Sequence, residues 1–219
     1  MTELGILKLI HILCLVYWLG ADLGVFYSSY FLVNEELPRK TRITISKILF
    51  FLDQSPRISM ILIFPSGIHL SKILGYLDIS YLLVSIIWIV ASLWLALVIV
   101  LHIRSQSVKN LAALDYWLRV SFATAMIIAV AFIIMYQPEY TWAGKKIFIF
   151  SLTVICGLII RHKLRMFEPA FIALIEEKET RTSNLIMKES IASSRPFVVF
   201  IWVCLLLNTS LGLHLIQVT

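Results

Sequence analysis

Charged side chains are scarce in this sequence: Asp, Glu, Lys and Arg make up 15% of its 219 residues, whereas 60% are hydrophobic. One water-soluble core of this size cannot bury so much apolar surface, so lipid must be part of the solvent. The net charge of +6 does not indicate nucleic-acid binding, because the basic residues stand in short stretches between apolar runs. We therefore expect the lipid bilayer as a partner and no nucleic acid.

Cysteine is also scarce, and its three positions, Cys14, Cys156 and Cys204, all lie inside apolar runs. An odd number of cysteines in such places does not indicate a disulfide framework, and they are most simply small buried apolar residues. The sequence further lacks a hydrolase triad, a phosphate-binding loop, a carboxylate-rich metal site and an HExxH zinc helix. Hydrolysis of the kind that soluble enzymes perform therefore has no support.

Six apolar runs are long enough to cross a membrane, and they lie near residues 6–33, 46–72, 79–103, 117–137, 144–163 and 196–216. About 20 apolar residues span the hydrocarbon, where only helices or closed barrels satisfy the backbone. The first run continues past Phe31, too long for a removable signal, and should be retained. The expected fold is all-α: a polytopic bundle of about six transmembrane helices forming a single domain over residues 1–219.

Lys and Arg are distributed unevenly, and 14 of the 19 lie in the loops that follow the first, third and fifth runs or at the run ends that adjoin these loops. Basic loops stay in the cytoplasm, which places both the N and C termini on the non-cytoplasmic side. The longest loop, residues 164–195, mixes apolar positions with Glu, Lys and Arg. It is expected to be a cytoplasmic, partly amphipathic helical connection, lying either on the membrane face or as a solvated hairpin.

Two charged residues, Asp22 and Arg57, stand in the middle of apolar runs. Charge is costly at that depth, so each is a candidate functional residue. Both lie about ten residues from the cytoplasmic end of their helix, and antiparallel helices would therefore bring them to a similar depth. Asp53, one turn before Arg57, is the competing partner. A structural ion pair and a role in handling protons or propionates both remain open.

Three histidines, His11, His69 and His214, stand at the ends of runs predicted to face outward. His11 and His69 should be nearly level, and Trp18 should share the helix face of His11. Level histidines on different helices are what a bis-histidyl haem b needs.

Two other interpretations of the histidines stay open. Copper could use the same two side chains, His11 and His69, together with Cys14 or Met60. Alternatively, the histidines bind nothing and simply sit at headgroup level.

The segment Lys8-Leu-Ile-His11, followed by Trp18 and then by Gly24-Val-Phe-Tyr27, forms a recognisable pattern. It resembles the first helix of HemJ-type protoporphyrinogen oxidases and of the related copper-resistance D membrane proteins, which carry a His, a Trp and a Gly-Leu-Phe-Tyr run. The resemblance implies that His11 ligates haem b.

We therefore expect a haem b-binding protein of the bacterial inner membrane, acting in electron transfer or in haem-linked oxidation of a membrane-borne substrate. Haem supplies the redox chemistry, so the protein would position it and set its potential. His11 is the leading ligand, with His69 or His214 in the other axial position. Trp18 would pack near the porphyrin, and Asp22 with Arg57 would steer propionates or protons.

Two alternatives from other classes remain. One is a copper or small-solute permease with Asp22 and Arg57 along its pathway. The other is a non-catalytic accessory subunit that docks through the small residues Gly20 and Gly24, since such residues let helices approach closely. A membrane redox partner or a second copy of the chain is the expected protein partner.

Overall fold

The computed structural model describes residues 2–104 and 109–215, and within these ranges the chain is helical with short connections and no strand. Six helical segments have the length and apolar composition needed to cross a membrane: Glu3–Leu32, Arg39–Ile73, Tyr81–Ile103, Asn110–Tyr136, Pro138–Ile175 and Arg181–Gly212. The all-α fold and the six spans predicted from hydropathy are confirmed at this level. The predicted end of the last run, residue 216, lies outside the described residues.

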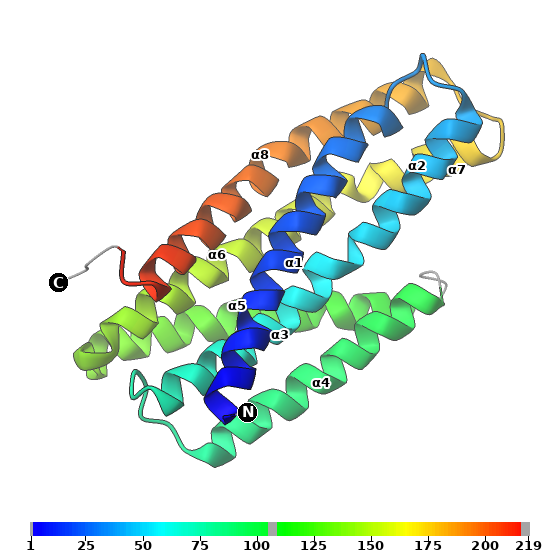
Figure 1. Ribbon diagram of the computed structural model, residues 1–219. Coiled ribbons are helices and arrows are strands. Elements are labelled where there is room, and N and C mark those ends of the chain that lie inside the picture. The colour runs from blue at the N-terminus through cyan, green and yellow to red at the C-terminus, as the bar shows by residue number, and fades with distance from the viewer. Residues whose placement is uncertain (1, 105–108, 216–219) are drawn as a thin grey trace.

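The helices in chain order are α1 (Glu3–Leu32), α2 (Arg39–Leu52), α3 (Gln54–Ile73), α4 (Tyr81–Ile103), α5 (Lys109–Tyr136), η1 (Pro138–Tyr140), α6 (Thr141–Lys163), η2 (Leu164–Met166), α7 (Phe167–Ile175) and α8 (Arg181–Gly212). Figure 1 shows them as an elongated bundle in which α1 lies between α8 and the α2–α3 segment, with α5 and α6 behind and α4 at one edge. Helix α1 begins and α8 ends at the same end of this bundle. We call that end the outer end and the opposite one the inner end, after the predicted orientation, which itself stays a prediction.

The second membrane-spanning segment is interrupted at Asp53, between α2 and α3. Pro56 lies in the first turn of α3 and has no N–H to donate to the carbonyl of Leu52, so the regular helix ends there. A second proline, Pro65, is accommodated inside α3. The interruption places the Asp53 carboxylate where the helix axis changes, close to the middle of the segment.

The connection over residues 164–195 contains η2, α7 and the first half of α8, which continues into the last span. A capping box between Thr180 and Ser183 starts α8. Beneath it, α7 and α8 enclose Leu174 and Met187, both 0% exposed, against Leu32 at the end of α1. The inner end is therefore a packed apolar cap of its own.

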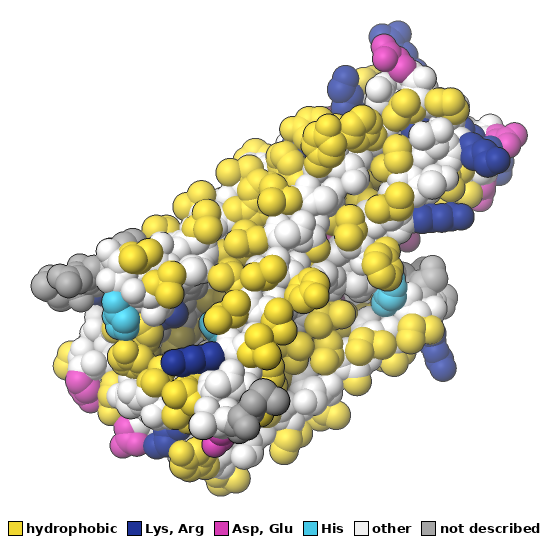
Figure 2. All heavy atoms as spheres, viewed as in Figure 1, with side chains coloured by type: hydrophobic (Ala, Val, Ile, Leu, Met, Phe, Trp, Pro, Cys, Tyr) yellow, Lys and Arg dark blue, Asp and Glu magenta, His cyan; other side chains and the backbone are white. Residues whose placement is uncertain are grey.

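On the face of the bundle seen in Figure 2, hydrophobic side chains predominate along its length, while several Lys and Arg side chains gather at the inner end near α2 and α7. Exposed apolar residues such as Leu93 on α4, 68% exposed, have no partner within the chain that covers them. Lipid is the solvent that such a surface requires. The structure thus agrees with a multi-pass membrane protein.

Candidate functional site

His11 is held by Ser66, across the interface between α1 and α3. Its Nδ1 lies 2.9 Å from the Ser66 hydroxyl oxygen, which itself lies 2.9 Å from the carbonyl of Leu62 and 3.0 Å from that of Ile63. The single hydroxyl hydrogen is taken by these carbonyls, so Ser66 accepts from His11 and we assign the imidazole proton to Nδ1. The Nε2 atom of His11 therefore carries an uncommitted lone pair.

Gly67 brings the two helices into direct contact beside this imidazole. A Cβ added at Gly67 would lie 3.1 Å from Cε1 of His11. A flat macrocycle consequently does not fit between α1 and α3 at this level. What His11 can offer to a cofactor is its Nε2 nitrogen, approached from a direction other than α3.

His69 joins the same two helices nearer the outer end. Its Nε2 lies 3.3 Å from a carboxylate oxygen of Glu3, and its Nδ1 is buried without a hydrogen-bond partner. A carboxylate on one ring nitrogen fixes the proton there and leaves the other nitrogen free to bind. His69 has the right tautomer for a ligand, but the contact at Gly67 prevents it from opposing His11 across a macrocycle between these helices.

His214 lies just beyond α8, with a positive φ of 54°. Its Nε2 is 3.0 Å from the hydroxyl of Tyr76, and its ring stacks on Trp142 with centroids 5.6 Å apart. The three histidines thus have three separate sets of partners. Among residues 2–104 and 109–215, no group of three or more His, Cys, Asp and Glu side chains is placed to hold a metal ion.

Trp18 and Asp22, the other two candidates on α1, both face the interior. Trp18 is 4% exposed and meets the edge of Phe150 on α6 at a centroid distance of 6.2 Å. Asp22 interacts with the indoles of Trp18 and of Trp202 on α8, although the buried Trp202 Nε1 does not reach a hydrogen bond of ordinary geometry. Within the described residues, the Asp22 carboxylate therefore has indole groups beside it and forms no ion pair with a Lys, Arg or His side chain.

Arg57 binds Asp53 and not Asp22. Its Nε and Nη2 donate to the same carboxylate oxygen of Asp53 at 2.8 and 2.5 Å, and within the described ranges no ion pair joins it to Asp22. The local partner prevails because it lies one turn away on the same helix, where no relative placement of two helices has to be achieved. Asp22 and Asp53 are nevertheless close enough to repel each other. The similar depth of Asp22 and Arg57 in the membrane stays a prediction.

A buried carboxylate that the sequence analysis missed, Asp115 on α5, organises the inner half of the bundle. Its side chain is 5% exposed and accepts hydrogen bonds from Trp94 Nε1 at 3.0 Å, Arg119 Nε at 3.1 Å and Arg161 Nη1 at 2.9 Å. Three helices, α4, α5 and α6, are tied together at this point. The fourth apolar run was predicted to begin only at residue 117, which left Asp115 in a loop; its i,i+4 spacing to Arg119 is the signal that could have found it.

Arg119 extends this group toward α3. Its Nη1 lies 3.4 Å from the Met60 sulfur and its guanidinium lies over the Trp94 ring at 5.7 Å. The charges of Arg57 and Arg119 also act on one another. We call Asp53, Arg57, Asp115, Arg119 and Arg161 the inner charge cluster. Met60, the sulfur considered for copper, is committed to it.

An aromatic layer fills the core between the outer histidines and the inner charge cluster. Its closest contacts are Phe64 with Phe122, at a centroid distance of 4.8 Å, and Trp94 with Phe122, at 5.4 Å. Phe150 stacks on Phe64 at 5.9 Å and forms a T-shaped contact with Trp18 at 6.2 Å. The two polar regions are therefore separated by packed rings.

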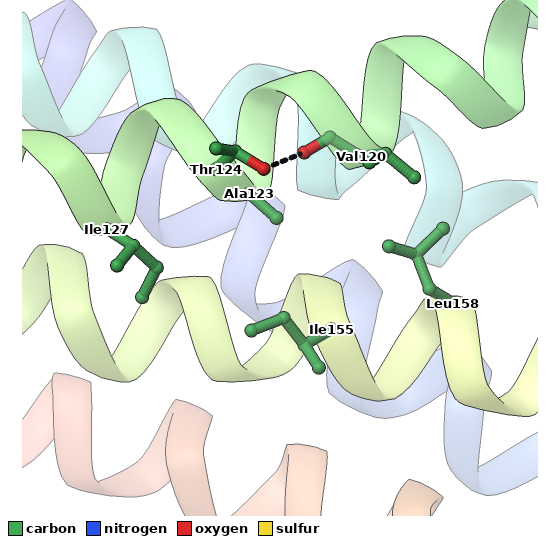
Figure 3. Close-up of a pocket in the computed structure, with 6 residues that line it drawn as sticks. All are labelled: Val120, Ala123, Thr124, Ile127, Ile155 and Leu158. Carbon is green, nitrogen blue, oxygen red and sulfur yellow. Dashed lines mark hydrogen bonds between the residues drawn. The ribbon is translucent and has the colours of Figure 1, made fainter.

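Two grooves on the bundle surface are lined mainly by apolar side chains. One, of about 300 Å³ between α5 and α6 (Figure 3), is lined by Val120, Ala123, Thr124, Ile127, Ile155 and Leu158. Its one hydroxyl, that of Thr124, donates to the Val120 carbonyl at 2.9 Å. A second, of about 470 Å³, runs between the outer halves of α5, α6 and α8, with Lys145 in its wall. Neither is lined by a histidine.

Comparison of the chain with protein-family models, with curated proteins and with solved structures found no match in any of the three.

Proposed function

We propose that this protein binds haem b in the membrane through Nε2 of His11, and that it acts in electron transfer or in haem-linked oxidation of a membrane-borne substrate. One observation carries the proposal: Nδ1 of His11 lies 2.9 Å from the Ser66 hydroxyl oxygen. With the imidazole proton assigned to Nδ1, the Nε2 atom presents a lone pair. Iron-ligating imidazoles are held in this way by a second hydrogen bond. The resemblance of the Lys8 to Tyr27 segment supports the same residue.

Haem, when bound, supplies one-electron redox chemistry, and the protein's residues hold and tune it. His11 would hold the haem iron. Trp18 and the aromatic rings beside it would exclude water from that side of the site, because Trp18 is almost fully buried. Since Arg57 is engaged by Asp53, we propose no propionate contact for it, and Asp22 is retained as the carboxyl group able to hold a proton near the site.

His11→Ala should abolish haem binding, because it removes the only atom proposed to bond the iron. The measurement is the visible spectrum of detergent-purified protein, oxidised and dithionite-reduced, made with ample haem supply. His102→Ala is the matched control, since His102 is exposed at the inner end of α4. A wild-type protein without a Soret band, or a His11→Ala protein with an unchanged one, would contradict the proposal.

Ser66→Ala tests the observation that carries the proposal. The variant keeps His11 but frees its ring to rotate and to change tautomer, so haem should still bind, about ten- to a hundred-fold more weakly. His69→Ala should leave the reduced α-band in place, since the close contact at Gly67 keeps His69 from opposing His11 across a macrocycle between α1 and α3 and His69 is not the proposed ligand. Loss of the band in His69→Ala but not in His11→Ala would reassign the iron to His69.

The two alternative classes are affected differently by the structure. A permease would use charged residues in the middle of the membrane, and the inner charge cluster supplies such residues. Transport by a preparation that contains no haem would support this alternative. For an accessory subunit, Gly24 is already in use, because a Cβ there would lie 3.0 Å from Leu52. Gly20, with nothing within 4 Å of such a Cβ, is the remaining docking position.

A further inference from the structure

Lys146 is a cation without a matching anion in the outer half of the bundle. It lies on α6, and its Nζ is 4.9 Å from the centre of the Trp142 ring. A Cβ added at Gly212 of α8 would come within 2.8 Å of this Nζ, so the amine is enclosed between the two helices. No ion pair of Lys146 occurs in the part of the chain that the structure describes. A partly buried ammonium group in such a place needs a counter-charge.

Two further polar atoms on neighbouring residues are buried without partners among the residues that the structure describes. Within that part of the chain, Trp142 Nε1 is a donor with no acceptor, and Asn208 Oδ1 is an acceptor with no donor. Asn208 is fixed next to the lysine, because its Nδ2 donates to the Lys146 carbonyl at 3.2 Å. A buried polar group without a hydrogen-bond partner destabilises the protein when nothing binds it. One ligand that met all three groups would remove this destabilisation.

We propose that Lys146, Trp142 and Asn208 form a binding site for a carboxylate group between the outer ends of α6 and α8. The two carboxylate oxygens accept from the ammonium and from the indole N–H, while Asn208 Oδ1 accepts from a hydroxyl or amino group next to the carboxylate. One cation and one neutral donor match a single negative charge. A phosphate would call for a guanidinium fork, which this site does not contain.

The carboxylate can come from two sources with the same chemistry. One is a small hydroxy or amino acid that enters from the outer end, which does not depend on haem binding. The other is a propionate of the haem proposed above, since His11 is near enough for the Lys146 charge to act on it. The second source rests on the proposed function, and the first does not.

The first experiment measures ligand-induced thermal stabilisation of the full chain in detergent, with lactate, alanine and sulfate as probes. Wild-type protein should be stabilised by lactate or alanine and not by sulfate. Lys146→Met should weaken that binding at least about ten-fold. Trp142→Phe, which keeps an aromatic ring but removes the indole N–H, should also weaken it. Lys145→Met is the matched control: it removes a neighbouring lysine that faces the second groove, so binding should be unchanged.

The second experiment compares the affinity of the purified apoprotein for haem and for haem dimethyl ester, which lacks free carboxylates. If the propionate is the ligand, wild type prefers haem by about ten-fold or more, Lys146→Met loses the preference and Lys145→Met keeps it. Stabilisation by lactate or alanine alone, in protein that takes up no haem, supports the site and sinks the proposed function. No stabilisation by lactate or alanine, together with equal affinity for haem and its dimethyl ester, would overturn the proposed site. In that case the Lys146 ammonium group only extends to the membrane–water interface.

Discussion

Asp115→Asn should lower the free energy of unfolding by roughly 3–5 kcal/mol, the largest effect expected from a single conservative change in this chain. The substitution keeps the shape of the side chain and an acceptor for Trp94 Nε1, but it removes the negative charge that Arg119 and Arg161 share. Arg119 is 13% exposed and would be left as a buried cation without its anion. The measurement is unfolding by sodium dodecyl sulfate in mixed micelles, followed by tryptophan fluorescence.

A paired substitution separates charge from packing. Asp115→Leu combined with Arg119→Leu removes both buried charges, and should cost less than Asp115→Leu alone, because an apolar pair needs no counter-charge. Arg161, with a side chain 40% exposed, can turn toward the interface in that background. If the double variant is no more stable than Asp115→Leu alone, the unpaired charge of Arg119 is not what destabilises the single variant.

Arg42→Ala should destabilise the inner end by roughly 3 kcal/mol or more. The Arg42 side chain, 3% exposed, donates to the Leu32 carbonyl at 2.9 Å, to Asn184 Oδ1 at 2.9 Å and to Glu179 at 3.3 Å. Its loss leaves a carbonyl at the end of α1 and an amide oxygen of α8 buried without donors. Unfolding in mixed micelles is again the measurement.

Two further variants test this interpretation of Arg42. Lys40→Ala, at an exposed position two residues earlier in α2, should change stability by no more than about 0.5 kcal/mol. Arg42→Lys keeps the charge but not the planar fork that reaches three acceptors, and should lie between wild type and alanine. An Arg42→Lys protein as stable as wild type would show that charge alone suffices.

Much of the fold was predictable from sequence because each membrane-spanning helix is stable in lipid through its own apolar composition. A segment such as Tyr81–Ile103 must be apolar and helical whatever its neighbours are, so hydropathy finds it. Pro56 acts locally too, because a proline interrupts a regular helix whatever its neighbours are. The first residue of a membrane-spanning helix was less predictable where the first turns of the helix contain charged side chains. The fourth begins at Asn110, seven residues before the predicted start at residue 117, and so carries Asp115 inside the bundle.

The site was only partly predictable, because its residues meet across helices that are distant in sequence. Sequence alone selected His11 as a candidate and gave two partners for Arg57. It could not choose between Asp22 and Asp53, since that choice depends on how far apart α1 and α3 place their side chains. It also could not find Ser66 opposite His11, which only the pairing of α1 with α3 reveals.

The sequence by itself therefore determined the helical class, the six segments long and apolar enough to cross a membrane, and the positions of the histidines near the ends of those segments. These properties follow from the free energy of transferring single segments from water into lipid, and that free energy depends on the composition of each segment alone. The tertiary structure decided which nitrogen of His11 is free, which carboxylate neutralises Arg119, and that Lys146 has no counter-charge in the described chain. Those outcomes depend on distances of a few ångström between helices, which no single segment encodes.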